Sequence, residues 1–463
     1  MDDVRDFIKL LRRPLNKLPD PLPMTPIPGP FTVSIRPSGS KSLTNRALIL
    51  GGLSNGVTYL RWPLLDADDA QVMVEGLRRM GAQIRVVRKD SDGELLRIDG
   101  VSGRPRGAGE LNLGGAGTAV RFLTAAAGLS DGETVIDGSD RMRHRPIAGL
   151  VAAMRAMKVR VDFLNEYGFP PIRISVAEDG GRLAGGTLHL PPQASSQFIS
   201  ALLMVAPWTR EGISIELDKP PISKPYVHMT LELLKRLGAT NVIASADLRE
   251  LLVAPGPLQA FDLNIEPDAS GATYFWAAAA NHPGSSCRIL GITQDSLQGD
   301  AAFPKLLNRM GASSHVDEDG ATVTAPIDGA LHSVDADLSD MPDAAMTLAA
   351  VACFAIGKTR MKGLGTLPIK ECNRLAATVT ELRKCSVLIE ATADSLSIES
   401  PKDGMGDEPI VFSTYHDHRM AMALAVVGLR RPNVSIADPV CVAKTYPTFW
   451  RDLSMLYEAA IEP

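Results

Sequence analysis

Basic side chains recur along this chain at the starts of apolar segments, where they could bind anions. In SGSKSLTNR at 38–46, a glycine-serine turn leads into the apolar segment 47–53. The start of a helix carries unpaired backbone N–H groups and partial positive charge, so it attracts anions. Lys41, Ser42 and Arg46 there indicate a phosphate or carboxylate ligand. The alternative interpretation is a serine-capped helix with surface basic residues.

Further polar turns follow in the first half of the chain. The loop GGAGT at 114–118 would let a ligand approach backbone N–H groups; the alternative is a flexible strand-to-helix turn. It lacks the Gly-Lys pair and the spacing of a Walker A motif. The other polar residues in this half that we consider are Arg121, Arg141, Arg143, Arg145, Ser195, Ser196, Gln197, Ser223, Lys224 and Tyr226. Solvated turns are the alternative for the serine-containing groups.

The second half of the chain adds carboxylates to the cations. Asp343 follows Pro342 at a predicted helix start, where it could also be a plain N-cap. In KECNR at 370–374, Lys370 and Arg374 share a face if the segment is helical, as they also would in an exposed ion-paired helix.

The segment YHDHR at 415–419 could suggest a metal site. We disfavour that interpretation because no third ligand is placed and Arg419 is adjacent. Lys444 lies in KTYP at 444–447.

Taken together, these residues form a cationic set that suits two anionic small molecules, one of them with a phosphate that leaves. The set comprises Lys41, Arg46, Arg141, Lys370, Arg374, Arg419 and Lys444. Asp343, Glu371, His418 and a lysine could move protons. We therefore predict transfer between phosphorylated or carboxylated substrates without a metal or another cofactor.

The elements that must position these residues repeat along the chain. A polar or acidic turn followed by an apolar helix recurs about every 75 residues. The predicted helix starts are Ser42, Thr118, Ser196, Ser270, Asp343 and Asp417. A second, amphipathic helix and apolar strands follow in the first five copies. The segments that contain the second helices are 74–86, 149–163, 231–244, 303–316 and 379–390, and the truncated sixth copy ends in a helix at 448–460.

This repetition predicts an α/β protein of two domains. The first helix of each unit is apolar nearly all round and should be central, whereas the second has a polar face and should lie outside. Six units contain more residues than a single hydrophobic core usually holds, so we expect two domains of three units each. Residues 4–18 could form a short amphipathic basic helix, and six prolines then crowd between Pro19 and Pro30. Residues 1–30 are expected to form a loosely ordered N-terminal extension, or a docking arm.

Composition narrows the class of function. The chain has 463 residues, 45% of them hydrophobic, a net charge of −5 and a pI of about 6.0, without the basic bias expected of a nucleic-acid-binding protein. Its five cysteines have no metal-ligand spacing and fit a reducing cytoplasm. We expect no membrane span, because the longest apolar run, 344–357, is too short to cross a bilayer. We expect no signal peptide, because the N-terminus carries Asp2, Asp3 and Asp6 and has no apolar h-region.

Eight segments resemble the signature segments of the enolpyruvylshikimate-phosphate synthase family. They are PSGSKSLTNRALIL, LGGAGTAVRFL, SSQFISALLMVAP, SKPY, PDAAMTLA, IKECNRLAA, YHDHRMAMALA and AKTYP, in order from about residue 31 to the C-terminus. The family transfers the enolpyruvyl group of phosphoenolpyruvate to the 5-hydroxyl of shikimate 3-phosphate in aromatic amino-acid biosynthesis. The resemblance implies domains at 38–266 and at 31–37 with 267–463. It also implies three βαβαββ-like units in each domain, arranged as an inside-out α/β barrel. A cytoplasmic monomer that binds neither nucleic acid nor membrane is expected.

The resemblance also implies roles for individual residues. Asp343 would accept the proton of the 5-hydroxyl, and Glu371 with Lys41 would transfer protons at the methylene carbon. Shikimate 3-phosphate would be held by Lys41, Ser42, Arg46, Ser195, Ser196, Gln197, Ser223, Tyr226, Asp343 and Lys370. Phosphoenolpyruvate would be held by Lys41, Gly115, Gly117, Arg141, Gln197, Arg374, Arg419 and Lys444.

The sequence departs from the family pattern at Gly115, Thr366, Pro368 and Asn373. We expect these departures to alter substrate affinity more than the chemistry. One alternative is the sister transferase acting on UDP-N-acetylglucosamine, which uses a reactive cysteine in the first half of the chain. Here no cysteine precedes Cys287. The other alternative is a catalytically idle ligand-binding relative.

Overall fold

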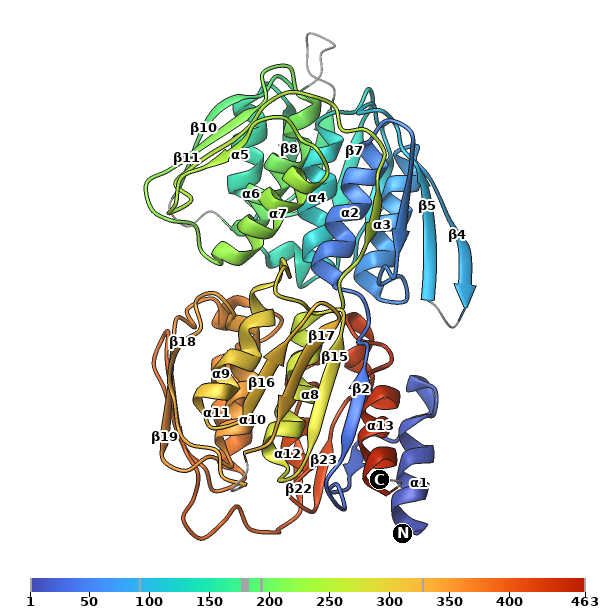
Figure 1. Cartoon of the computed structure of the whole chain (residues 1–463). Coiled ribbons are helices and arrows are strands. Elements are labelled where there is room, and N and C mark those ends of the chain that lie inside the picture. The colour runs from blue at the N-terminus through green and yellow to red at the C-terminus, as the bar shows by residue number, and fades with distance from the viewer. Residues whose placement is uncertain (1, 91–92, 176–182, 192–194, 327–328, 462–463) are drawn as a thin grey trace. The chain divides into compact units, whose positions relative to one another are not determined.

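The chain divides into two compact units, each of which is described by itself. Unit 1 contains residues 1–38 and 266–463, and unit 2 contains residues 39–265, so the chain passes between the units twice. The computed structural model (Figure 1) describes residues 2–90, 93–175, 183–191, 195–326 and 329–461.

One pattern of strands and helices recurs in both units. A strand, a helix, a second strand, a second helix and two further strands follow one another, and the strands form a sheet in the order first, second, fourth, third. The first two strands are parallel, which requires the helical crossover between them, and the remaining pairs are antiparallel.

Unit 2 contains three such assemblies. The first consists of β14 (Asp262–Asn264), α2 (Lys41–Leu53), β3 (Val57–Arg61), α3 (Asp68–Arg79), β4 (Gln83–Asp90) and β5 (Gly93–Asp99). The second consists of β6 (Gly109–Asn112), α4 (Gly117–Ala127), β7 (Thr134–Asp137), α5 (Ala148–Ala156), β8 (Arg160–Phe163) and β9 (Ile172–Ser175). The third consists of β10 (Gly186–Leu190), α6 (Ser196–Val205), β11 (Ile213–Leu217), α7 (Lys224–Arg236), β12 (Val242–Ala244) and β13 (Glu250–Val253).

Unit 1 contains two complete assemblies and a shortened one. The first consists of β2 (Thr32–Ile35), α8 (Ala269–Asn281), β15 (Ser286–Leu290), α9 (Phe303–Arg309), β16 (Ser313–Val316) and β17 (Gly320–Thr324). The second consists of β18 (Asp335–Asp337), α10 (Ala345–Ala352), β19 (Lys358–Lys362), α11 (Arg374–Arg383), β20 (Leu388–Ala391) and β21 (Leu396–Glu399). The third consists of β22 (Ile410–Phe412), α12 (His418–Gly428), β23 (Val434–Ile436), α13 (Phe449–Ile461) and β1 (Leu22–Met24).

Three strands lie far in sequence from the sheets that they complete: β14, β2 and β1, of which β1 pairs with β23. β14 follows the third assembly of unit 2 in the chain but pairs in parallel with β3 of the first. β2 precedes unit 2 in the chain but pairs in parallel with β15, with Val33 opposite Cys287. Each crossing between the units is therefore preceded by a strand that completes a sheet.

The expectation of a loosely ordered N-terminal extension is wrong. Helix α1 (Asp2–Leu11) packs on α13, where the ring centroids of Phe7 and Tyr457 lie 5.1 Å apart. β1 lies within the proline-rich segment and pairs with β23, Leu22 opposite Ile436. The prolines are compatible with this pairing because β1 has only three residues and lies at the edge of its sheet.

The first helix of each assembly is central, as predicted from its apolar character. In α8 and α12, all residues are buried, and in α2 the residues from Leu43 onward are buried. The second helices keep a polar face; α3, for example, buries Met73 and Leu77. None of the helices in the described part of the chain combines the length and apolar character needed to cross a membrane.

Candidate active site

A buried arginine, Arg374, organises the charged residues of unit 1. Its Nε donates to Asp417 Oδ2 at 2.7 Å and its Nη1 donates to Asp343 Oδ1 at 2.7 Å. Its Nη2 donates to Glu371 Oε2 at 2.9 Å and to Asp417 Oδ1 at 3.1 Å. One guanidinium thus contacts three carboxylates, which its planar fork of donors permits.

Three further cations surround these carboxylates. Lys444 Nζ lies 2.9 Å from Glu371 Oε1. Arg419 Nη2 lies 3.4 Å from Asp343 Oδ2, and Lys370 Nζ lies 3.7 Å from Asp343 Oδ1. We refer to the group as the Arg374 cluster; its members are Asp343, Lys370, Glu371, Arg374, Asp417, Arg419 and Lys444.

The backbone explains why these side chains converge. Arg374 is the first residue of α11, Asp343 lies in the 3-10 helix η5 (Pro342–Ala344) ahead of α10, and Arg419 lies in the first turn of α12. These three helices contact one another. Asp417 is the N-cap of α12 and its Oδ1 accepts from the Arg419 N–H at 2.9 Å. Helix starts from successive repeats therefore meet at one place in unit 1.

Burial and pairing shift the pKa values of the cluster. Burial by itself lowers the pKa of Arg374, but Asp417, Glu371 and Asp343 outweigh it and raise that pKa above its usual value. Burial also works to raise the pKa of Asp417, but Arg374 and His418 lower it below its usual value. Both groups are therefore charged at neutral pH.

Arg46 has an equivalent central place in unit 2, without a carboxylate among its hydrogen-bond partners. Its Nε donates to Thr230 Oγ1 at 2.8 Å, and its Nη2 donates to Ser200 Oγ at 3.2 Å and to the Tyr226 carbonyl at 3.0 Å. Its Nη1 donates to the Ser42 carbonyl at 2.9 Å. Burial lowers the pKa of Arg46 to about 10, so it is still protonated at neutral pH. Arg46 thereby holds α2, α6 and α7 together.

Lys41 pairs with a carboxylate of the neighbouring helix. It is the first residue of α2, after the N-cap Ser40, and its Nζ lies 3.1 Å from Asp69 Oδ2 near the start of α3. Both side chains are largely buried. The pair sets the position of the ammonium group relative to the α2 start.

The glycine loop leads into α4 with little side-chain bulk. Gly114 has φ of +54°, and a Cβ added at Gly114 or Gly115 would have no atom within 4 Å. Gly117 begins α4, and a Cβ there would lie 2.6 Å from Arg145 Nη1. A side chain at Gly117 would therefore displace the Arg145 guanidinium from its place against the loop. Arg141 is exposed and precedes the 3-10 helix η2 (Met142–His144).

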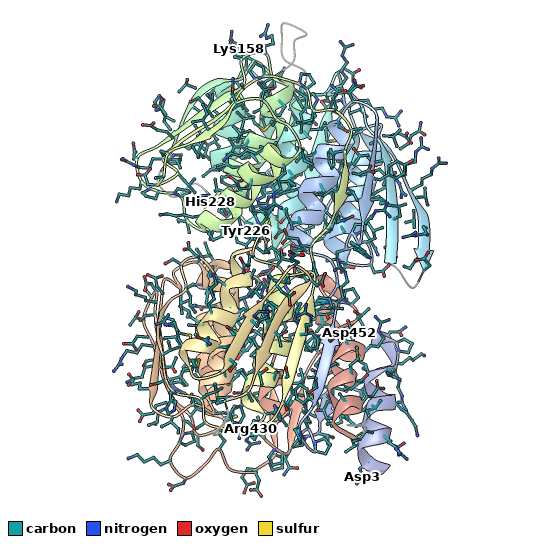
Figure 2. All side chains as sticks on the ribbon, viewed as in Figure 1. Asp3, Lys158, Tyr226, His228, Arg430 and Asp452 are labelled. Carbon is teal, nitrogen blue, oxygen red and sulfur yellow. The ribbon has the colours of Figure 1, made fainter. Side chains whose placement is uncertain are left out.

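The remaining predicted residues of unit 2 lie at two further helix starts. Ser195 is the N-cap of α6, and its Oγ accepts from the Gln197 N–H at 3.2 Å, while Ser196 is buried. Ser223 is the N-cap of α7 in a left-handed conformation, φ 59°, which is costly for a serine. Tyr226 and His228 of α7 are labelled in Figure 2. The structure thus divides the predicted site residues into a unit 1 set and a unit 2 set; many lie at helix starts, whereas Lys444 ends the 3-10 helix η7 (Pro439–Lys444).

Besides Asp417, which it named only as a helix start, the sequence analysis missed two buried carboxylates close to predicted site residues or helix starts. Asp69 pairs with Lys41, and Asp300, in the 3-10 helix η4 (Gly299–Ala302), accepts from the Ser270 hydroxyl. Burial is the main cause that raises the pKa of Asp300 to about 6, and the nearby Asp343 carboxylate is the second cause. Both lie at the start of a second helix and contact the start of the first helix of the same assembly. The repeat was therefore the signal that could have found them.

Comparison with known proteins decides the family. A family model described as EPSP synthase (3-phosphoshikimate 1-carboxyvinyltransferase) matches residues 26–453. The chain belongs to this family. A protein named 3-phosphoshikimate 1-carboxyvinyltransferase from Thiobacillus denitrificans is 39% identical over 427 residues, covering 90% of this chain and 95% of the relative. One of the same name from Edwardsiella ictaluri is 38% identical over 428 residues, covering 92% and 96%.

Solved structures share the fold of this EPSP synthase family member. An EPSP synthase from Acinetobacter baumannii has a TM-score of 0.75 and 23% identity, covering 92% of this chain and 96% of that chain. The enolpyruvyl transferase NikO from Streptomyces tendae has a TM-score of 0.73 and 20% identity, covering 94% and 97%. The predicted α/β class with two domains and the predicted family are confirmed.

Proposed function

We propose that this chain transfers the enolpyruvyl group of phosphoenolpyruvate to the 5-hydroxyl of shikimate 3-phosphate and releases phosphate. The observation that carries the proposal is the EPSP synthase match over residues 26–453. The Arg374 cluster supports it, because the reaction brings together two anions and needs both cations and proton acceptors. The relatives are named 3-phosphoshikimate 1-carboxyvinyltransferase, which describes this transfer, and the step belongs to aromatic amino-acid biosynthesis.

The proposal assigns phosphoenolpyruvate mainly to cations. Arg374 and Arg419 are buried in unit 1 and Lys444 is half-buried there, so their charges are poorly screened by water. Lys444 and Arg374 both pair with the Glu371 carboxylate. A bound phosphoenolpyruvate would therefore compete with Glu371 for these two cations. Lys41, Gly115, Gly117, Arg141 and Gln197 of unit 2 complete the proposed set.

The proposal assigns shikimate 3-phosphate mainly to unit 2. Helix starts supply backbone N–H groups beside hydroxyls, which suits a phosphate. Ser42 follows the first residue of α2, Ser195 and Ser196 begin α6, and Ser223 precedes α7. Arg46 holds α2 and α7 together through the Ser42 and Tyr226 carbonyls. The remaining proposed contacts are Lys41, Gln197, Tyr226, Asp343 and Lys370.

The proposed mechanism is an addition followed by an elimination. Glu371, with Lys41, protonates the methylene carbon of phosphoenolpyruvate, which makes C2 electrophilic. The 5-hydroxyl oxygen adds to C2 while Asp343 takes its proton, giving a tetrahedral ketal. The C–O bond to phosphate then breaks, and loss of a proton from the methyl carbon restores the double bond. Acid–base groups of this kind contribute about 10²–10⁴-fold each.

A coupled phosphate-release assay tests the proposed function. We expect phosphate to be released only when phosphoenolpyruvate and shikimate 3-phosphate are both present, with either one alone as the control. Normal binding of shikimate 3-phosphate without phosphate release would mean a catalytically idle relative. Release with UDP-N-acetylglucosamine in place of shikimate 3-phosphate would mean the sister transferase. In either case the proposed function is wrong.

A further inference from the structure

The N-terminal residues are an integral part of unit 1, although residues 1–25 lie outside the family match. In Figure 1, α1 lies alongside α13. Between the two helices, the Phe7 and Tyr457 rings pack edge to face. Arg12 Nε donates to Ser454 Oγ at 3.2 Å, and Arg12 also pairs with Glu458. The segment is thus anchored to α13 between Ser454 and Glu458, about one helical turn, so its own position is fixed where it bonds to another loop.

Asp20 accepts one such hydrogen bond. Its Oδ1 accepts from the Asp438 N–H at 2.9 Å. On either side, the 3-10 helix η1 (Leu15–Lys17) contacts the 3-10 helix η7 (Pro439–Lys444), and β1 pairs with β23, which ends at Ile436. Asp20 is therefore held directly opposite the turn that joins β23 to η7.

Asp438 is the junction between two loops of the proposed active site. It has a left-handed backbone, φ 47° and ψ 56°, and directly precedes η7, whose last residue is Lys444. Its Oδ2 also lies 2.6 Å from Nδ1 of His416. A left-handed aspartate persists only where surrounding contacts hold it, and the hydrogen bond from Asp20 is one of them.

His416 is also left-handed, with φ of 55°, as is Tyr415 with φ of 57°. It directly precedes Asp417, which orients the Arg374 guanidinium through Nε and Nη2. A continuous set of hydrogen bonds thus connects Asp20 through Asp438 to the turn that positions Asp417. The same junction begins the helix that ends at Lys444.

We propose that Asp20 is a positioning residue for phosphoenolpyruvate binding. It touches no substrate; it fixes the left-handed Asp438 turn, which sets the position of Lys444 and, through His416, that of Asp417 and Arg374. The ligand class rests on the proposed function, whereas the mechanical connection rests on two hydrogen bonds and on the chain that joins Asp438 to Lys444 and His416 to Asp417. The N-terminal segment thereby adjusts an active site to which it contributes no contact with substrate.

Steady-state kinetics of full-length variants test this role. We expect Asp20→Ala to raise KM for phosphoenolpyruvate about 3- to 10-fold, with kcat and KM for shikimate 3-phosphate within about twofold of wild type. Asp20→Asn keeps an oxygen acceptor and should restore most of the affinity. Asp3→Ala is the matched control, since Asp3 lies at the surface at the start of α1 (Figure 2) and carries the same charge. We expect it to behave as wild type.

Hydrogen exchange provides a readout that does not require activity. We expect faster exchange at 415–419 and 438–444 in Asp20→Ala than in wild type, with unchanged exchange in α1 and β1. Unchanged KM or unchanged exchange at these loops overturns the proposal. Equal losses in kcat and in both KM values, together with a lower melting temperature, also overturn it, because they indicate a general structural role. A wild type that releases no phosphate contradicts the proposed function, and the exchange measurement still decides the role of Asp20.

Discussion

At the scale of single residues, the stability of the Arg374 cluster depends on the balance between one buried guanidinium and its carboxylate partners. Its guanidinium is buried and contacts Asp343, Glu371 and Asp417. Removing one partner of a buried ion pair costs more than the pair contributes, because the remaining charge stays desolvated. A substitution in this cluster should therefore keep the size and shape of the side chain and change only its charge or its ability to take up a proton.

Replacing Asp343 by asparagine separates proton acceptance from binding. An asparagine side chain has the size of aspartate and can still accept a hydrogen bond from Arg374, but it takes up no proton at neutral pH. We expect Asp343→Asn to lower kcat by about 10²–10⁴-fold. The dissociation constant of shikimate 3-phosphate, measured by titration, should change by less than tenfold. Near-normal phosphate release from this variant would contradict the role assigned to Asp343.

Asp300 makes the free energy of unfolding depend on pH, and the direction of this dependence can be predicted. Its pKa is raised to about 6 from an ordinary value of 3.8, so the folded state holds a proton that the unfolded state has lost between these values. Stability contributed by the neutral acid is therefore present below pH 3.8 and lost as pH rises through 6. We expect Asp300→Asn, which has no charge to bury, to gain stability relative to wild type by about 1–3 kcal/mol between pH 4 and pH 7.5.

Urea unfolding at several pH values measures this difference. Asp403→Asn is the matched control, because Asp403 is exposed and its neutralisation should give a difference that is nearly constant with pH. A stability difference for Asp300→Asn that is flat from pH 4 to pH 7.5, or that falls with pH, would show that the Asp300 carboxylate is not destabilised by burial.

At the scale of elements, the start of α2 depends on a close backbone approach. A Cβ added at Gly39 would lie 2.2 Å from the Trp62 carbonyl oxygen and 3.3 Å from the Leu64 nitrogen. Neither backbone atom can move without disturbing the segment between β3 and α3. We expect Gly39→Ala to lower the free energy of unfolding by about 2–4 kcal/mol.

Gly115→Ala is the matched control for that substitution. A Cβ there would have no atom within 4 Å, and Gly115 is exposed. We expect its free energy of unfolding to stay within about 0.5 kcal/mol of wild type. Chemical denaturation of both variants measures the two values. Equal effects would mean that the Gly39 contact does not limit the α2 start.

Much of this element order could be predicted from sequence, because the apolar helices are long and repeat. The predicted starts at Ser42, Thr118, Ser196 and Ser270 lie within one residue of the observed starts of α2, α4, α6 and α8. The second helices were placed less well: α3 begins at Asp68 and α7 at Lys224, earlier than the quoted segments, because their first turns are polar and lack apolar periodicity.

The pairing of strands that lie far apart in the sequence could not be predicted from local sequence patterns. Nothing near β14 indicates that it completes the sheet of β3, and nothing near β1 indicates β23. The proline-rich composition around β1 pointed instead to a linker. In the site, the cations and Asp343 were found from their types and from the family resemblance. Asp69 and Asp300 were missed because an acidic residue at a helix start is common in any protein.

At the scale of the whole molecule, unit 2 is one continuous segment of chain. Residues 39–265 contain all strands of its three sheets, including β14. We expect a fragment of residues 39–265 to fold alone, with cooperative urea unfolding followed by circular dichroism. It should bind shikimate 3-phosphate more weakly than the full chain, since Asp343 and Lys370 are absent, and it should release no phosphate.

A shorter fragment, residues 39–260, is the control for this prediction. It lacks β14 and leaves β3 without its parallel partner, which pairs Asp262 with Tyr59 in the full chain. We expect it to be less stable than the 39–265 fragment. An unfolded 39–265 fragment, or equal stability of the two fragments, would contradict the view of unit 2 as an independent folding unit completed by β14.

The pairing of β1 and β2 with late strands also determines the order in which a newly made chain can fold. Synthesis proceeds from the N-terminus, so α1, β1 and β2 leave the ribosome before unit 2 does. Their partners are α13, β23 and β15, which are translated only after unit 2 is complete. Unit 2 can therefore fold while the ribosome is still working. The apolar side chains of Phe7, Ile8 and Leu11 meanwhile have no partner helix and are available to chaperones. These segments are thus synthesised before unit 2 and become buried after it.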